Sequence, residues 1–297
     1  MDLDLKGKRA VVTGASKGIG RAVAESLAGE GCDLTLVARG SAELEELAAT
    51  LSARFGVAAV AVPTDMADER ARQALAADWA GADILVNNAG AIPGGEIGEV
   101  SDEVWRGAWE LKVFGYIALC RLFYAAMSER GRGVIVNVIG TAGERPNAAY
   151  IAGTTGNAAL MAFTRALGAR APDAGLRVVG VNPGMTATDR AVTMMRTFSA
   201  QRHGDAERWP EVERALGLPF GRMGTPREVA DMVTFLASPR AGYVSGTIVT
   251  VDGGPATAAP ERNRKTTRQD RTQGQRPEKG QRNGPTKWEE GTCARSR

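Results

Sequence analysis

The stretch "RAVVTGASKGIGRAVAESLAGEG", residues 9–31, decides the fold. It begins with a short apolar run typical of a buried strand, passes through the glycine-rich segment "TGASKGIG" (residues 13–20), and continues as a helix pattern that glycine closes. Glycines at such a turn let the backbone approach a pyrophosphate closely, and the free N–H groups at the helix amino terminus bind its charge. The stretch therefore predicts a strand, a phosphate-binding turn and a helix.

The same alternation continues along the chain. Further β-branched runs stand at residues 32–39, 57–63, 83–90, 133–140, 176–184 and 246–254. Helix patterns separate them at residues 41–55, 67–79, 102–128, 158–168 and 226–238. Continuous apolar strands joined through helices indicate a parallel sheet with both faces covered, whose ligands bind beyond the carboxyl ends of the strands. The sequence thus predicts an α/β fold, a single doubly wound Rossmann-type domain over residues 1–255.

Composition excludes several classes of protein. Hydrophobic residues make up 43% of the 297-residue chain and charged residues 24%, which fits a soluble globular protein with a real core. No stretch approaches the roughly 18 apolar residues of a membrane span, and the amino terminus lacks the apolar region of a signal peptide. Cys32, Cys120 and Cys293 stand apart without CxxC spacing, so neither a disulfide framework nor a metal site is expected. We expect a cytoplasmic protein with no membrane contact.

The carboxyl-terminal segment is basic, whereas the rest of the chain is mildly acidic. Residues 261–297 hold eleven Lys or Arg and five Asp or Glu, so the net charge of +3 leaves residues 1–260 at −3. We expect residues 256–297 to be a disordered basic tail, because a segment with almost no aliphatic residues cannot bury enough apolar surface to offset chain entropy. A nucleic-acid-binding arm is the less favoured alternative, since Trp288 is the only aromatic residue there that could stack on a base.

Four further sequence strings support a cofactor-binding role for the glycine-rich turn. They are "NNAG" (87–90), "VNPGMTATD" (181–189), "GRMGTPREVADMVTFLAS" (221–238) and "YVSGTIVTVDGG" (243–254). Glycine turns between strand and helix also occur for packing alone, but five strings at these places are highly specific. Over about residues 5–254 the chain resembles the short-chain dehydrogenase/reductase family, and the resemblance implies a NAD(P)-dependent oxidoreductase.

The resemblance also implies a set of cofactor contacts. Phosphates would lie against the glycine-rich loop, adenine beside "PTDMAD", ribose along "NNAG" and nicotinamide at "NPGMTATD". The residues concerned are Gly14, Ser16, Lys17, Gly18, Ile19, Gly20, Asp65, Met66, Asn88, Ala89, Gly90, Pro183, Gly184 and Thr188. For Asn87 and Asn88 the alternative role is plain hydrogen bonding at a strand end.

The choice between NAD and NADP depends on the end of the second strand. An acidic residue there would bind the ribose 2′-hydroxyl of NAD, whereas arginine accommodates the 2′-phosphate of NADP. This chain has Ala38 at that position and Arg39 after it, with Lys17 nearby in the glycine-rich loop and no carboxylate expected to repel the phosphate. Either cation could be a solvated surface charge. The sequence favours NADP, with NAD as the alternative.

The catalytic residues of the family are replaced in this chain. Its members share an asparagine, a serine, and a tyrosine and lysine spaced as Tyr-x-x-x-Lys. An ungapped alignment through "GVIVNVIG" and "AALMAFTRALG" puts Gly140 at the serine, Gly153 at the tyrosine and Asn157 at the lysine. Lys112 stands at the position aligned with the family's asparagine. A second register makes Tyr150 the tyrosine, but it needs two indels and still lacks the lysine.

Three hypotheses therefore remain for the catalytic half. Tyr150 supplies the proton and the Lys112 ammonium lowers its pKa from a neighbouring helix. In the second hypothesis the pocket binds NADP(H) without turnover, as a sensor or an inactive oligomer partner. In the third, Tyr150 is an ordinary loop aromatic and Lys112 a surface lysine. The first is favoured.

Two further segments bear on partners. An apolar stretch that could form an adaptable lid over an apolar small-molecule substrate contains Val192, Met194, Met195, Phe198 and Trp209, although packing or an interface explains it equally well. Family members commonly form tetramers by pairing their long helices, and "GYIALCRLFYAAM" (115–127) is apolar enough for this. We expect a homo-oligomer.

Overall fold

Seven parallel strands form one sheet in the order β3-β2-β1-β4-β5-β6-β7. The computed structural model describes residues 1–254, and the predicted tail at residues 256–297 lies outside the described residues. The strands are β1 (Arg9–Thr13), β2 (Asp33–Ala38), β3 (Ala59–Pro63), β4 (Ile84–Asn87), β5 (Gly133–Val138), β6 (Leu176–Pro183) and β7 (Ile248–Val251). Each lies inside a predicted strand run, so the predicted doubly wound α/β fold is confirmed.

The strand order reverses at β1. β2 and β3 extend from one side of β1, while β4 to β7 extend from the other. Val11 of β1 accordingly pairs with Thr35 of β2 and with Leu85 of β4. In open α/β sheets the ligand crevice lies at such a reversal, beyond the carboxyl ends of the strands. The segments that leave β1 and β4 therefore border the predicted cofactor site.

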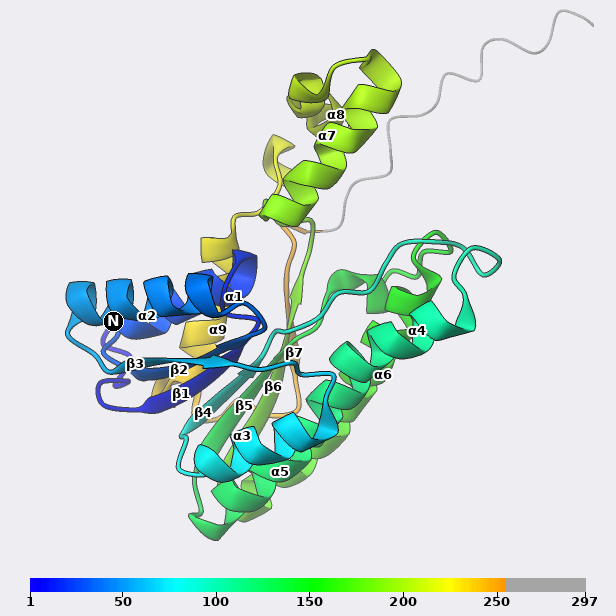
Figure 1. Ribbon diagram of the computed structural model, residues 1–297. Coiled ribbons are helices and arrows are strands. Elements are labelled where there is room, and N and C mark those ends of the chain that lie inside the picture. The colour runs from blue at the N-terminus through cyan, green and yellow to red at the C-terminus, as the bar shows by residue number, and fades with distance from the viewer. Residues whose placement is uncertain (255–297) are drawn as a thin grey trace, which may run out of the picture. The chain divides into compact units, whose positions relative to one another are not determined.

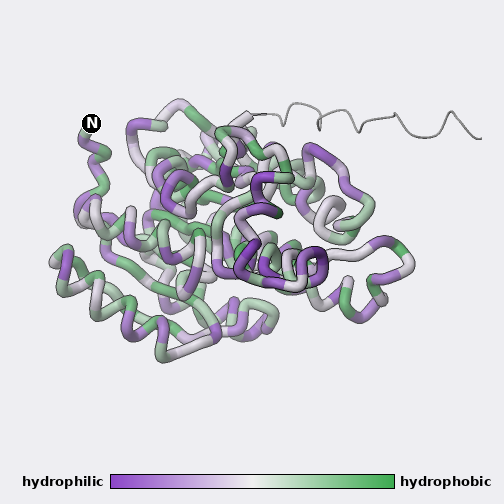
Figure 2. The backbone as a smooth tube through the Cα atoms, turned by 90° about the horizontal axis from the view of Figure 1, so that it is seen from above, coloured by the Kyte–Doolittle hydropathy of each residue, from purple (hydrophilic) through white to green (hydrophobic). Residues whose placement is uncertain are grey.

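Helices cover both faces of the sheet. Among the described residues they are α1 (Gly18–Gly29), α2 (Ser41–Phe55), α3 (Glu69–Asp78), α4 (Asp102–Trp109), α5 (Gly115–Glu129), α6 (Ile151–Arg170), α7 (Asp189–His203), α8 (Trp209–Ala215) and α9 (Pro226–Ala237). Helices α1, α2 and α9 lie on one face, and α3, α5 and α6 on the other (Figure 1). Along the helices the tube in Figure 2 alternates between hydrophilic and hydrophobic colours, as amphipathic helices on a buried sheet do.

Successive residues of a strand pack into two separate hydrophobic cores, one on each face of the sheet. Val12 packs in the cluster beneath α1, α2 and α9, whereas its neighbour Val11 packs in the cluster beneath α3 and α5. A parallel strand covered on both faces requires apolar side chains at successive positions, which is why the strand sequences read as continuous apolar runs.

Residues 102–129 form one continuous helical segment in which α4 passes through a π-helical turn, η1 (Glu110–Phe114), into α5. Single π-turns inside helices frequently occur at functional sites, and this one carries Lys112. By length and composition alone the segment could cross a membrane, which differs from the expectation drawn from the sequence. Here Leu119, Phe123 and Met127 are buried against the sheet, so we interpret it as a core helix.

Helices α7 and α8, which no helix pattern predicts, follow β6 and stand apart from the two layers of helices (Figure 1). They enclose a small core of their own, in which Met195 is buried and Val192 and Trp209 pack around it. Met194 and Phe198 are exposed. Three of the five apolar residues expected in a lid thus stabilise the segment itself, and two remain for contact with a ligand.

Candidate active site

The glycine-rich loop and the β4 exit meet closely. A Cβ on Gly14 would lie 2.9 Å from the Ala89 Cα, and one on Gly20 would lie 2.1 Å from the Gly14 carbonyl oxygen. Gly14 also has a φ of +67°, which glycine adopts without strain. Only glycine fits these two positions. This closely packed backbone, together with the amino terminus of α1, forms the cradle that is expected to bind a pyrophosphate.

Asn88 has a mainly structural role in this cradle. Its Nδ2 donates to the carbonyl oxygens of Thr13 (3.1 Å) and Gly14 (3.3 Å). The Thr13 hydroxyl in turn accepts from the backbone N–H groups of Asn88 (2.9 Å) and Ala89 (3.1 Å). These bonds fix the "NNAG" turn to the glycine-rich loop. Strand-end hydrogen bonding, the alternative considered for this residue, therefore engages its side-chain amide.

The loop after β6 closes over the other side of the glycine-rich loop. The Gly184 N–H donates to the Val251 carbonyl (2.9 Å), which holds the loop to β7. Thr188 caps α7 by accepting from the Ala191 N–H, and a Cβ on Gly18 would lie 3.0 Å from the Thr188 methyl. The loops after β1, β4 and β6 thus come together at the carboxyl edge of the sheet, where the ligand crevice of such folds is expected.

Two cations and one carboxylate stand at the β2 end of the crevice. Arg39 is exposed, and the Lys17 Nζ lies 3.9 Å from a carboxylate oxygen of Glu43 in the first turn of α2. The expectation that no carboxylate stands near the 2′-phosphate position is therefore wrong. No sequence pattern predicts this contact, because Glu43 is an ordinary acidic residue in the first turn of a predicted helix.

Asp65 and Met66, expected beside the adenine, separate in the structure. Asp65 is exposed and its carboxylate accepts from the Ala67 N–H at 2.9 Å. Met66 is 3% exposed and belongs to the core beneath α3 and α5, while its carbonyl accepts from Arg72. The Met66 side chain therefore belongs to the protein interior.

Tyr150 takes the place that a side chain on Gly153 would occupy. It is the N-cap residue of α6, and its ring lies so close to Gly153 that a Cβ on that glycine would stand 2.0 Å from two ring atoms. Gly153 is the position aligned with the family's tyrosine. The ring packs beside Ile92 and Ala152, and an isolated bridge joins Tyr150 to Gly95. The Tyr150 ring thus lies over Gly153, although Tyr150 itself stands three positions earlier in the chain.

Lys112 reaches the same region from η1. Its aliphatic chain lies along Gly90, since a Cβ on that glycine would be 2.7 Å from the Lys112 Cδ, and its Nζ donates to the Ile139 carbonyl at 2.7 Å. Burial, together with the charge of Arg190, lowers the pKa of Lys112 to about 8. The ammonium therefore lies between the "NNAG" turn and the end of β5.

The phenol does not acquire the low pKa that was expected. Burial raises the pKa of Tyr150 above its usual value, and the charge that opposes this comes from Arg190 of α7 rather than from Lys112. The prediction that Lys112 keeps this pKa low is wrong in its direction, because desolvation of the phenol outweighs the nearby charge. Arg190 was missed in the sequence, because no pattern there predicts the helix that brings it close to Tyr150.

The aligned serine and lysine positions are filled by a glycine and an amide. A Cβ on Gly140 would lie 3.0 Å from the Asn157 Nδ2, and the Gly140 N–H donates to the Asn182 side chain at 3.2 Å. Asn157 is 3% exposed, and its Oδ1 has no hydrogen-bond partner within residues 1–254. An amide can bind a hydroxyl but supplies no charge, so these positions cannot perform the family's serine and lysine roles.

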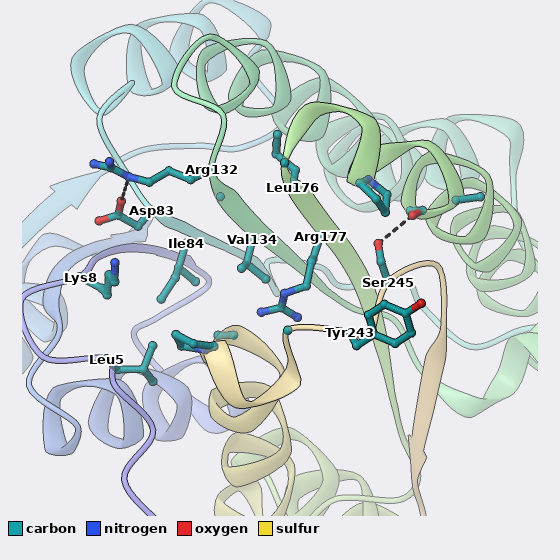
Figure 3. Close-up of a pocket in the computed structure, with 18 residues that line it drawn as sticks. Leu5, Lys8, Asp83, Ile84, Arg132, Val134, Leu176, Arg177, Tyr243 and Ser245 are labelled. Carbon is teal, nitrogen blue, oxygen red and sulfur yellow. Dashed lines mark hydrogen bonds and ion pairs between the residues drawn. The ribbon is translucent and has the colours of Figure 1, made fainter.

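A separate cavity of about 670 Å³ lies at the amino-terminal edge of the sheet, away from the crevice (Figure 3). Arg177 stands at its centre and donates to the carbonyls of Leu236 (2.8 Å), Ser238 (3.0 Å) and Val244 (3.3 Å). Burial lowers the pKa of Arg177 to about 10. Because the protein's own carbonyls use these donors, Arg177 ties the end of α9 to β6 and has a structural role.

Comparison with known proteins matches the crevice to a family. Residues 8–197 match the family model described as short chain dehydrogenase. Galactitol 2-dehydrogenase (L-tagatose-forming) of Cereibacter sphaeroides is 37% identical over 255 residues, covering 84% of this chain and 95% of the relative. A 3-oxoacyl-[acyl-carrier-protein] reductase of Vibrio cholerae is 31% identical, covering 85% of this chain and 98% of the relative.

A solved structure shares the whole fold. L-sorbose reductase from Gluconobacter frateurii, complexed with NADPH and L-sorbose, superposes with a TM-score of 0.81 at 34% identity, covering 86% of this chain and 98% of that one. The range matched by the family model, residues 8–197, contains β1 to β6 and the loops after β1, β4 and β6.

Proposed function

Because this chain belongs to the short-chain dehydrogenase family, we propose that it is an oxidoreductase that transfers a hydride between NADP(H) and a carbonyl or alcohol substrate, with Tyr150 as the proton-transferring group. One observation carries the proposal: the Tyr150 ring fills the space above Gly153 where the family's tyrosine would project. Loss of the tyrosine from its usual position is thereby compensated by a phenol three residues earlier.

The crevice fits a nicotinamide dinucleotide. Gly14 and Gly20 form a backbone cradle that admits no side chain, because a Cβ at either would meet backbone or amide atoms within 3 Å, and α1 begins there with no side chain capping its N–H groups. Residues that would hold the cofactor are those of the glycine-rich loop, the "NNAG" turn, and the loop from Pro183 to Thr188. When bound, the cofactor supplies or accepts the hydride.

NADP is the cofactor we propose, for two reasons. Arg39 is exposed beside the end of β2, where it can pair with a 2′-phosphate, and Lys17 adds a second cation. L-sorbose reductase, which shares the fold, was solved with NADPH. Glu43 reduces the advantage by pairing with Lys17, so we expect a preference for NADPH rather than exclusion of NADH.

Tyr150 supports reduction better than oxidation at neutral pH. Burial raises the pKa of its phenol, so the group stays protonated and can donate its proton to the carbonyl oxygen as hydride reaches the carbonyl carbon. The product is the alcohol, and the phenol regains its proton from water. Alcohol oxidation requires the phenolate, which forms only at higher pH.

A test begins with calorimetric titration of the full chain with NADPH, followed by a screen of carbonyl compounds for loss of NADPH absorbance. Tyr150→Phe should reduce turnover on any substrate found by about 10²–10⁴-fold, the usual contribution of an acid–base group, while NADPH affinity stays nearly unchanged. Turnover that survives in Tyr150→Phe would contradict the assignment of the phenol.

A protein that binds NADP(H) with little or no turnover is the second candidate. The observation in its favour is the replacement of the serine and lysine by Gly140 and Asn157, whose Oδ1 is left without a partner in the described part of the chain. NADPH binding without consumption across the whole screen would support it. We also propose a homo-oligomer, because Val104 and Phe114 leave apolar surface exposed on the long helical segment. The proposed cytoplasmic location rests on the isolated cysteines.

A further inference from the structure

Two cations converge on the Tyr150 side of the crevice from different elements. Lys112 enters from η1 and donates to the Ile139 carbonyl at 2.7 Å. Arg190, in the first turn of α7, donates through Nη2 to the Ile92 carbonyl at 2.9 Å. Ile92 in turn packs in one apolar cluster with Tyr150. The guanidinium and the phenol are therefore neighbours across Ile92.

The two cations are also close to each other. Lys112 lies along Gly90, and Arg190 binds the carbonyl two residues further along the same loop. The charge of Arg190 contributes to the lowered pKa of Lys112, as expected for two like charges that share a site. In the absence of an anion, this arrangement disfavours the charged form of Lys112.

No carboxylate of the described residues neutralises them. Neither Lys112 nor Arg190 forms an ion pair within residues 1–254. Asp189, which precedes Arg190 in α7, is exposed and forms no ion pair with it in the described residues, and three other acidic groups nearby are engaged elsewhere. Glu110 of η1 pairs with Arg72 at 2.8 Å, Glu144 accepts from Asn182 and Thr250, and Asp252 pairs with Arg145 at 2.7 Å.

Both cations keep donors free. An ammonium has three N–H donors and a guanidinium five in a planar fork, and each group donates to one carbonyl here. A carboxylate matches the fork of an arginine and can accept from an ammonium at the same time. Its binding would remove the repulsion between the two charges.

We propose that the substrate carries a carboxylate, which Lys112 and Arg190 bind while the substrate's carbonyl faces Tyr150. This rests on the proposed function and replaces the expectation of an apolar substrate with that of an oxo acid or hydroxy acid. Met194 and Phe198 would then contact the remainder of the molecule from α7. Lys112 becomes a substrate-binding residue rather than the group that activates the phenol.

The test uses benzoate and benzamide, which share a shape and differ in charge. We expect benzoate to bind the NADP⁺-loaded full chain at least tenfold more tightly than benzamide in calorimetric titration. Arg190→Gln and Lys112→Met should each weaken benzoate binding about tenfold and leave benzamide unchanged. Arg202→Gln, which removes a cation from the last turn of the same helix, is the matched control and should change neither.

Several outcomes overturn the proposal. These are equal affinity for the two probes, no binding of benzoate, an equal loss in Arg202→Gln, or an effect of Arg190→Gln on NADPH affinity in place of benzoate affinity. Failure of the proposed function looks different. A chain that binds benzoate as expected yet reduces neither 3-oxobutanoate nor any other carbonyl keeps the carboxylate site and loses the turnover.

Discussion

The cofactor half and the catalytic half of the crevice are built in different ways. In the cofactor half the proposed contacts are made by backbone, and the residues that matter are those that admit no side chain: a Cβ on Gly14 or Gly20 would meet backbone and amide atoms at 2.1–3.1 Å. In the catalytic half the chemistry belongs to side chains, which can reach one point from several positions. Tyr150 reaches the place of residue 153, and Lys112 and Arg190 come from two other elements.

This difference explains why one half keeps its sequence pattern and the other does not. A backbone cradle depends on consecutive residues, so its spacing is fixed. A phenol that must stand at a point in space is not fixed to a position in the chain, provided that the residue beneath it is small. Tyr150 can hold its position only because residue 153 is glycine. A larger residue at 153 should therefore impair the same proton transfer that loss of the Tyr150 phenol impairs.

The largest effect is expected in the cofactor half. Gly20→Ala puts a Cβ 2.1 Å from the Gly14 carbonyl oxygen and 2.5 Å from the Asn88 amide, so the glycine-rich loop must move. We expect NADPH affinity to fall by more than about 100-fold, because the loop supplies the phosphate cradle. Calorimetric titration measures it. Gly29→Ala is the control, since its nearest contact is an ordinary one at 3.7 Å; unchanged binding in Gly20→Ala would disprove the cradle.

Gly153→Ala should separate the two halves. Its methyl group would overlap the Tyr150 ring, which must turn away although the phenol itself is retained. We expect turnover to fall by about 10–100-fold, a part of what removal of the acid–base group costs, with NADPH affinity unchanged. Steady-state kinetics and titration are read together, with Gly107→Ala as control because nothing lies within 4 Å of that position. Equal activity in both variants would show that the ring's placement over Gly153 is irrelevant.

Sequence reasoning reached the fold and the cradle because both follow from local patterns. Apolar runs fixed the seven strands, and the strings around Gly14, Asn88 and Thr188 located the crevice. It did not reach contacts between distant segments. The pairing of Glu43 with Lys17, and the convergence of Arg190 on the lysine of η1, depend on how α2 and α7 pack, which no local pattern encodes.

The third effect is on the preference for NADPH over NADH, which depends on the charged residues at the β2 end of the crevice. Arg39→Ala should weaken NADPH binding by about tenfold and leave NADH binding unchanged, because the loss is that of one charge-assisted contact to the 2′-phosphate. Glu43→Gln should act in the opposite direction and strengthen NADPH binding a few-fold by freeing Lys17. Titration of both variants with both cofactors decides the matter. An equal loss for NADPH and NADH in Arg39→Ala would leave the preference for NADP without support.

The smallest effect concerns the stability of the catalytic half. The pKa of Lys112 falls from 10.5 to about 8 on folding, so at neutral pH the folded chain holds a charge that burial disfavours. Lys112→Met removes this penalty, and we expect the free energy of unfolding at pH 7 to rise by about 1 kcal/mol, less than the full shift implies because the side chain is only half-buried.

The pH dependence of the free energy of unfolding shows whether the fold disfavours or stabilises the charged form of Lys112. Between about pH 8 and 10.5 the unfolded chain keeps the proton that the folded chain has lost, so the stability of the unmodified protein rises with pH in this window and approaches that of Lys112→Met. Urea unfolding at pH 7, 9 and 10.5 follows the difference, with Lys6→Met as an exposed control. A difference that grows with pH would mean that the fold stabilises the ammonium. In that case Lys112 would already have its partner within the protein, and would not need the carboxylate of a substrate.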